Sequence, residues 1–367
     1  RLFRICSVSL YAGTRSRFCL KKENWLNCRR YSTESVHEHE NKYQEPFKVE
    51  NHSYSFVPQV TEMDSTSGVR SFSEYENTDK EKEVRREQGL LMIDAVRRGD
   101  LKSIQDLIQN GAPVDVLSRD GFSLLNLSAS PDDNDTIAEE LIRAGAPLNW
   151  TTWNGSFPIH ECAWKDARKV ARVVLNYGQN VNSRDAANRT PLHVACMKGH
   201  SRMVTFLIHC GADVNATDNH DGTPLHLVAS FGRSGVASTL ITNGADPKAA
   251  RFGGHTPLHD CVAKGFKYIV VELLELGVDP NVMGIAPWTP LMLAALYGHH
   301  GCLRTLLRYG AEPDIQDYNG ETALHYACRM GDQISAKILV QNAARVDIQD
   351  NDGMTALHHA VIKGNQM

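Results

Sequence analysis

Residues 87–367 repeat one pattern of apolar and polar positions every 33 residues. Each copy contains two short stretches in which apolar residues recur at helical spacing, and glycine with polar residues separates the stretches. The first stretch carries small residues such as Ala195-Cys196, and the second carries paired large residues such as Leu306-Leu307. The pattern predicts pairs of short helices, with small side chains where neighbouring helices approach closely.

Residues with special backbone chemistry mark where each helix begins and ends. A Thr-Pro-Leu-His tetrad starts the first helix, because threonine caps a helix and proline fits its first turn. Complete or degenerate tetrads begin at positions 157, 190, 223, 256, 289, 322 and 355. Glycine suits the left-handed position after the second helix, at Gly145, Gly178, Gly211, Gly244, Gly277 and Gly310. Ala343 replaces this glycine in the next copy, so we expect the C-terminal end to be the least stable part.

This pattern resembles the ankyrin repeat, and the resemblance covers residues 87–367. It implies an all-α fold with short β-hairpin-like turns, in which about eight repeats and an incomplete ninth stack as a solenoid. The last copy stops at Met367, after its first helix. Because a solenoid end needs a polar cap, we expect the ankyrin-repeat domain to be truncated at its C-terminus.

The N-terminal region differs from the repeats in composition. Residues 1–31 hold six Arg and two Lys against one acidic residue. This composition resembles a mitochondrial transit peptide, with cleavage expected between Tyr31 and Ser32; a basic disordered tail is the alternative. Residues 32–86 are polar and poor in aliphatic residues, which predicts a disordered linker. The tract His37-Glu38-His39-Glu40 lacks the spacing that places two histidines on one helical face, which favours a solvated charge run.

Charge and composition restrict the function. The formal net charge of 39 − 43 = −4 gives no global attraction for nucleic acid. No apolar run approaches the roughly 18 residues that span a bilayer, so we expect no membrane insertion. Nine cysteines without a CxxC pair favour a reducing compartment. We expect a cytoplasmic or nuclear protein, with a mitochondrial location as the alternative.

The sequence offers little catalytic chemistry. It has no phosphate-binding, dinucleotide-binding, metalloprotease or hydrolase motif, so we predict no enzymatic activity, no cofactor and no metal site. Histidine recurs in the tetrads, at His160, His193, His226, His259, His325 and His358. Helices stacked about 8–10 Å apart do not bring two such rings within the roughly 4 Å that a shared zinc ion requires. We expect each imidazole to hydrogen-bond backbone and to tie neighbouring repeats together.

Three asparagines occupy equivalent loop positions, at Asn182, Asn215 and Asn281. They resemble the asparagines that an oxygen-dependent hydroxylase modifies in ankyrin proteins. Hydrogen bonding within the loops is the favoured interpretation.

In the ankyrin family, the turn tips and the exposed side of the first helices carry the partner-binding residues. Here these positions hold aromatic residues, Met and Arg, which are enriched at interface hot spots. The candidates are Trp153, Trp164, Arg189, Met197, Phe231, Phe252, Trp288, Tyr297, Tyr318 and Arg329. Packing of each tip on the next is the alternative for the aromatic residues. Lys165, Lys198 and Lys264 share one column, which suits either an acidic partner or a solvated face.

These features predict a non-enzymatic scaffold that binds a protein or peptide along the concave face of an ankyrin array. The alternative is the substrate-receptor arm of a ubiquitin ligase, with ligase components as partners. A regulatory arm of an enzyme is a further alternative. In both cases the second domain would follow residue 367.

Overall fold

The computed structural model describes residues 72–129, 134–284 and 287–364, with side chains from residue 80 onward. Over these residues the regular elements are helices, and strand pairing is confined to two isolated antiparallel bridges, Leu117–Ser123 and Gln349–Thr355. The expected all-α fold with hairpin-like turns is confirmed. The leader at residues 1–31 and most of the linker lie outside the described residues.

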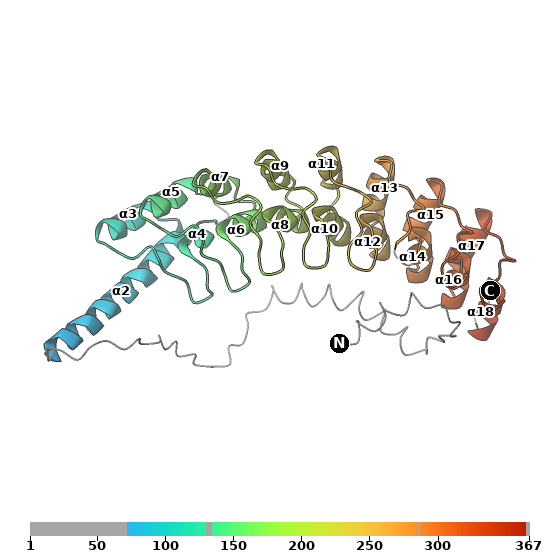
Figure 1. The fold of residues 1–367 in the computed structure, drawn as a ribbon, viewed down its shortest axis with the longest axis horizontal. Helices are drawn as coiled ribbons and strands as arrows, with labels where there is room; N and C mark the ends of the chain where they lie inside the picture. The colour runs from blue at the N-terminus through green and yellow to red at the C-terminus, as the bar shows by residue number, and fades with distance from the viewer. Residues whose placement is uncertain (1–71, 130–133, 285–286, 365–367) are drawn as a thin grey trace, which may run out of the picture. The chain divides into compact units, whose positions relative to one another are not determined.

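The helices after residue 100 lie in two rows (Figure 1). The first row contains the opening helix of each repeat: α4 (Leu124–Ser128), α6 (Pro158–Lys165), α8 (Pro191–Lys198), α10 (Pro224–Phe231), α12 (Pro257–Ala263), α14 (Pro290–Tyr297), α16 (Ala323–Met330) and α18 (Ala356–Ile362). The second row contains α3 (Leu101–Gln109), α5 (Asp135–Arg143), α7 (Arg168–Asn176), α9 (Ser201–His209), α11 (Ala237–Thr242), α13 (Lys267–Glu275), α15 (His300–Arg308) and α17 (Gln333–Gln341). Each first-row helix contacts its neighbours in the row, so the repeats stack as a solenoid.

Helix α2 (Phe72–Arg98) opens the array and corrects one prediction. It begins within residues 32–86, the segment predicted from the sequence to be a disordered linker. Charged residues with high helix propensity extend the helix toward its N-terminus without an apolar stripe, so the periodicity did not reveal it. Near its C-terminal end, Met92, Ala95 and Val96 are buried, and α2 packs against α3 and α4.

Apolar side chains fill the space between the rows. One buried cluster runs from Ala129 to Ala360, and a second, from Met92 to Ala146, lies at the N-terminal end. Ala195 and Cys196 have no exposed surface. Their small side chains let neighbouring first-row helices approach closely, as the sequence pattern predicts.

The histidine of each Thr-Pro-Leu-His tetrad can hydrogen-bond both the start of its own helix and the backbone of the next repeat. We call a histidine that makes both bonds a bridging histidine. The backbone N–H of Thr190 donates to Nδ1 of His193 (3.1 Å). Because Nδ1 accepts this bond, the ring proton lies on Nε2, which donates to the carbonyl of Gly222 (3.1 Å). The same bridge joins His160 to Arg189, His226 to His255, His259 to Trp288 and His325 to Met354. For these five residues, the prediction that histidine ties neighbouring repeats is confirmed.

Candidate protein-interaction face

The turns extend from the side of the first row, and together they form what we call the loop-side face (Figure 1). Backbone hydrogen bonds of 2.9–3.1 Å join the tips of neighbouring turns. The amide of Ala186 donates to Asn154, Asn219 to Ala187, Phe252 to His220 and Asn351 to Asn319. Side chains at these tips are therefore presented from a backbone that is fixed relative to the next repeat.

The loop asparagines add a second link between turns. Asn182 donates through Nδ2 to the carbonyl of Gly211 (3.2 Å) and accepts through Oδ1 from the amide of Asp213 (2.9 Å). Asn215 and Asn281 make the same pair of bonds to their next loops. The interpretation of these residues as loop hydrogen-bonding groups is confirmed.

Three of the candidate residues are largely exposed at turn tips. Trp153 exposes 86% of its surface, and Phe252 and Tyr318 each expose 72%. The indole nitrogen of Trp153 lies against Gly121 of the preceding tip, where an added Cβ would stand 1.8 Å from it. Trp153 thus contacts the neighbouring tip along one edge and leaves most of its ring to solvent.

The other aromatic candidates on this face are half-buried. Trp164, Trp288 and Tyr297 pack against the main core cluster, and Trp288 also meets the Tyr326 ring at a centroid distance of 5.3 Å. Phe231 lies in the last turn of α10 and is half-buried as well. Contact within the array occupies much of the surface of these side chains.

The two arginine candidates are held by ion pairs. Nη2 of Arg189 lies 2.8 Å from Oδ2 of Asp185. Arg329 pairs with Glu321, and its guanidinium carbon lies 4.6 Å from the centre of the Tyr326 ring. Both charges are therefore compensated in place.

Two of the three lysines in the shared column contact side chains within the array. Nζ of Lys165 lies 3.0 Å from Oε1 of Glu161. The ammonium of Lys198 lies 3.3 Å from the centre of the Trp164 ring. The candidate Met197, next to Lys198 in α8, is half-buried. These contacts weaken the case for an acidic partner at Lys165 and Lys198.

A buried polar cluster between the last repeats was not predicted from the sequence. The Tyr326 hydroxyl donates to Oδ2 of Asp317 (2.5 Å), and Nε2 of His359 lies 2.7 Å from Oδ2 of Asp350. Glu321 lies beside them, and burial raises the pKa of its carboxyl group.

One sequence signal could have revealed this cluster. Tyr326 and His359 stand at the same position of the repeat, which holds Val194, Leu227 and Leu293 in three other copies and the acidic Glu161 and Asp260 in two. Polar residues at a position that is apolar in three copies indicate buried polar contacts.

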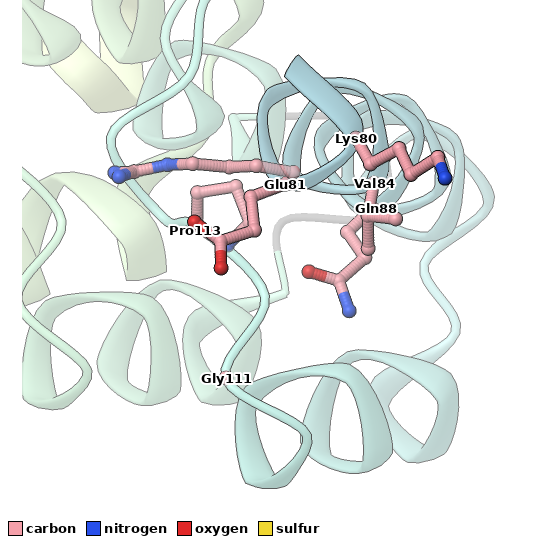
Figure 2. A pocket seen from close by; sticks show the side chains of 7 residues that line it. Lys80, Glu81, Val84, Gln88, Gly111 and Pro113 are labelled. Atoms are coloured by element: carbon pink, nitrogen blue, oxygen red, sulfur yellow. The ribbon is translucent and has the colours of Figure 1, made fainter. Parts of the chain in front are cut away.

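A hollow of about 500 Å³ lies near the N-terminal helix (Figure 2). It is lined by Lys80, Glu81, Val84, Arg85, Gln88, Gly111 and Pro113. Four of the seven lining residues carry charged or amide side chains, whereas most ligand pockets are lined predominantly by apolar residues. The hollow is therefore a weaker candidate site than the loop-side face.

The comparisons with known proteins agree with the repeat geometry. The family model for ankyrin repeats (three copies) matches residues 91–185, 192–284, 258–350 and 291–367. The chain therefore belongs to the ankyrin-repeat family, whose repeats generally mediate protein–protein interaction and typically carry no catalytic activity. Among the described helices, none is both long and apolar enough to cross a membrane.

Two solved structures are similar to this chain. The ankyrin repeat domain of Bcl-3, a member of the IkappaB protein family, is 26% identical with a TM-score of 0.53, over 56% of this chain and 95% of that one. The human ASB11 ankyrin repeat domain is 26% identical with a TM-score of 0.49, over 56% of this chain and 97% of that one. The comparison with curated proteins found no match.

Proposed function

We propose that the protein is a non-enzymatic scaffold that binds a protein or peptide along its loop-side face. The observation that carries this proposal is the exposure of Trp153, Phe252 and Tyr318 at turn tips. Large aromatic side chains at such positions are frequent hot spots, where truncation costs about 2 kcal/mol or more. No role for nucleic acid or a cofactor is needed.

The rigidity of the face supports the same function. All three tips belong to turns that a hydrogen bond joins to a neighbouring turn: Asn154, beside Trp153, accepts from the amide of Ala186, the amide of Phe252 donates to His220, and Tyr318 accepts from the Asn351 side chain. A surface that is already ordered loses little conformational entropy when it binds. Half-buried side chains in the last turns of the first-row helices, such as Trp164 and Tyr297, would add contact area without new ordering.

A capture experiment with a matched control tests this function. The full chain is compared with a variant carrying Trp153→Ala, Phe252→Ala and Tyr318→Ala, and bound proteins are identified by mass spectrometry. The control is Tyr268→Ala, which removes an 82% exposed aromatic from α13 in the second row. We expect specific partners to be lost, with affinity at least about tenfold weaker, in the triple variant alone.

Circular dichroism confirms that both variants fold. Partners that persist with the folded triple variant would contradict binding through the tips. The compartment of the captured partners also tests the cytoplasmic, nuclear and mitochondrial alternatives for location.

The substrate-receptor alternative stays a prediction. Its cullin-recruiting box would follow residue 367. Ubiquitin-ligase subunits that bind a longer chain and persist with the triple variant would favour it over a plain scaffold.

A further inference from the structure

Glu321, Asp350 and His359 come together from three separate segments of the last two repeats. Glu321 precedes α16, Asp350 lies in the turn before α18, and His359 lies within α18. They are only 4%, 9% and 9% exposed. One nitrogen or oxygen atom of each lies within 4.8 Å of the others. Nε2 of His359 is 2.7 Å from Oδ2 of Asp350 and 3.8 Å from Oε1 of Glu321.

The charge in this cluster is not balanced by the ionisable side chains that form it. Asp317, Glu321 and Asp350 supply three negative charges, and Arg329 supplies one positive charge. The formal sum of these four side chains is 1 − 3 = −2. A buried excess of negative charge is costly, and a divalent cation would remove it.

We propose that Glu321, Asp350 and His359 bind a divalent transition-metal ion, with Zn²⁺ as the best fit. Zinc accepts imidazole nitrogen and carboxylate oxygen at about 2.0–2.2 Å, so donor atoms in a tetrahedral site lie roughly 3.3 Å apart. The observed separations of 2.7 and 3.8 Å bracket that spacing. A water molecule would supply the fourth ligand. Ca²⁺ and Mg²⁺ favour sites made only of oxygen, so the imidazole argues for zinc.

Neighbouring groups hold the donors in place. Oδ1 of Asp350 accepts hydrogen bonds from the amides of Asp352 and Met354 (3.0 and 2.9 Å), which leaves Oδ2 for His359. Nη1 of Arg329 pairs with Oε1 of Glu321, the same oxygen that lies 3.8 Å from Nε2 of His359, and would hold this carboxylate in place, as hydrogen-bonding groups around zinc ligands do. When Zn²⁺ binds Nε2 of His359, the neutral ring carries its proton on Nδ1 instead.

The chain contains an internal control for this site. Nε2 of His300 lies 2.9 Å from Oδ2 of Asp332, which is the same kind of pair. Over the described residues, only Glu321, Asp350 and His359 bring three such donors together. The His300 pair therefore separates binding by a three-donor site from weak binding by any histidine and carboxylate.

Calorimetric titration with Zn²⁺ tests the proposal on the full chain. The parent carries His37→Gln and His39→Gln, so that the N-terminal His-Glu tract does not contribute to the signal. We expect one tight site in the parent, an affinity at least about tenfold weaker in His359→Gln and in Glu321→Gln, and no change in His300→Gln. Equal affinity in parent and His359→Gln, or no binding by the parent, would overturn the proposal.

A second measurement keeps the test decisive if His359→Gln fails to fold. Co²⁺ replaces zinc in such sites and gives visible absorption bands that report direct coordination. The folded parent should show these bands and lose them when Zn²⁺ is added. Zn²⁺ should also raise the Tm of the parent but not that of folded Asp350→Asn. Absence of the bands, or an equal rise in Tm in both proteins, would contradict the site.

Discussion

At the residue scale, the ends of the second-row helices show where the array is strained. After α15, the amide of Gly310 donates to Leu307 and that of Ala311 to Leu306 (3.1 and 3.0 Å). Gly310 reaches these bonds at φ +89°, which costs glycine little. After α17, Ala343 takes the same position at φ +64°. Its Cβ crowds the backbone there, so this alanine is strained.

Replacing Ala343 by glycine should stabilise the protein. Relief of about 1–2 kcal/mol of left-handed strain exceeds the roughly 0.4–1 kcal/mol gained by the unfolded chain from glycine. We expect Ala343→Gly to raise the free energy of unfolding by about 0.5–1 kcal/mol, measured by urea unfolding. Gly310→Ala, at a site with nothing within 4 Å of an added Cβ, should lower it. A stabilising Gly310→Ala would contradict this account.

At the scale of the element, one histidine connects the start of a first-row helix to the next repeat. Helix α14 shows what happens without it. The amide of Thr289 meets Sδ of Met292 at 3.5 Å, and a thioether has no proton to donate to the following repeat. The interface between α14 and α16 therefore lacks the histidine hydrogen bond that joins the other repeats from α6 to α18.

Placing methionine at the bridging position of α12, as α14 has it, should lower the free energy of unfolding. His259→Met removes the donor of the 2.8 Å bond to the carbonyl of Trp288. We expect a loss of about 1–3 kcal/mol, the usual cost of leaving a buried polar group without its partner, seen as a lower urea midpoint. Met292→Leu is the control, because it changes shape without removing a bridge. The account fails if His259→Met costs no more than Met292→Leu.

The helices and their ties could be predicted from the sequence, whereas the exposure of the candidate residues could not. Every copy carries its own start and stop residues, so helix order follows from the repeat. Exposure depends on a residue in the neighbouring copy. Trp153 meets only a glycine, Gly121, in the neighbouring copy, so most of its ring stays exposed. Trp288 instead packs against the ring of Tyr326 in the next copy. The donors of the proposed metal site are likewise spread over two copies, and only stacking brings them together.

At the scale of the whole molecule, the five bridging histidines are buried in the neutral state. Burial lowers the pKa of His193 and of His259 to about 4. It also lowers the pKa values of His160, His226 and His325. In the unfolded chain each would titrate near 6.5. Protonation of these histidines at low pH therefore weakens every first-row interface from α6 to α18 except that between α14 and α16.

The resulting pH dependence has a definite sign. As the pH falls from about 6.5 toward 4, the unfolded chain binds protons that the folded chain does not, so stability falls by about 1.4 kcal/mol per pH unit for each histidine in its window. Above pH 6.5 this contribution is complete. Tm measured between pH 7.5 and 4.5 should therefore drop on acidification, and less steeply in His259→Met. Equal slopes in the two proteins would contradict the assignment.

Because each repeat couples only to its neighbours, hydrogen exchange at pH 5 should show the α14–α16 interface, where Met292 stands, as the least affected by acid.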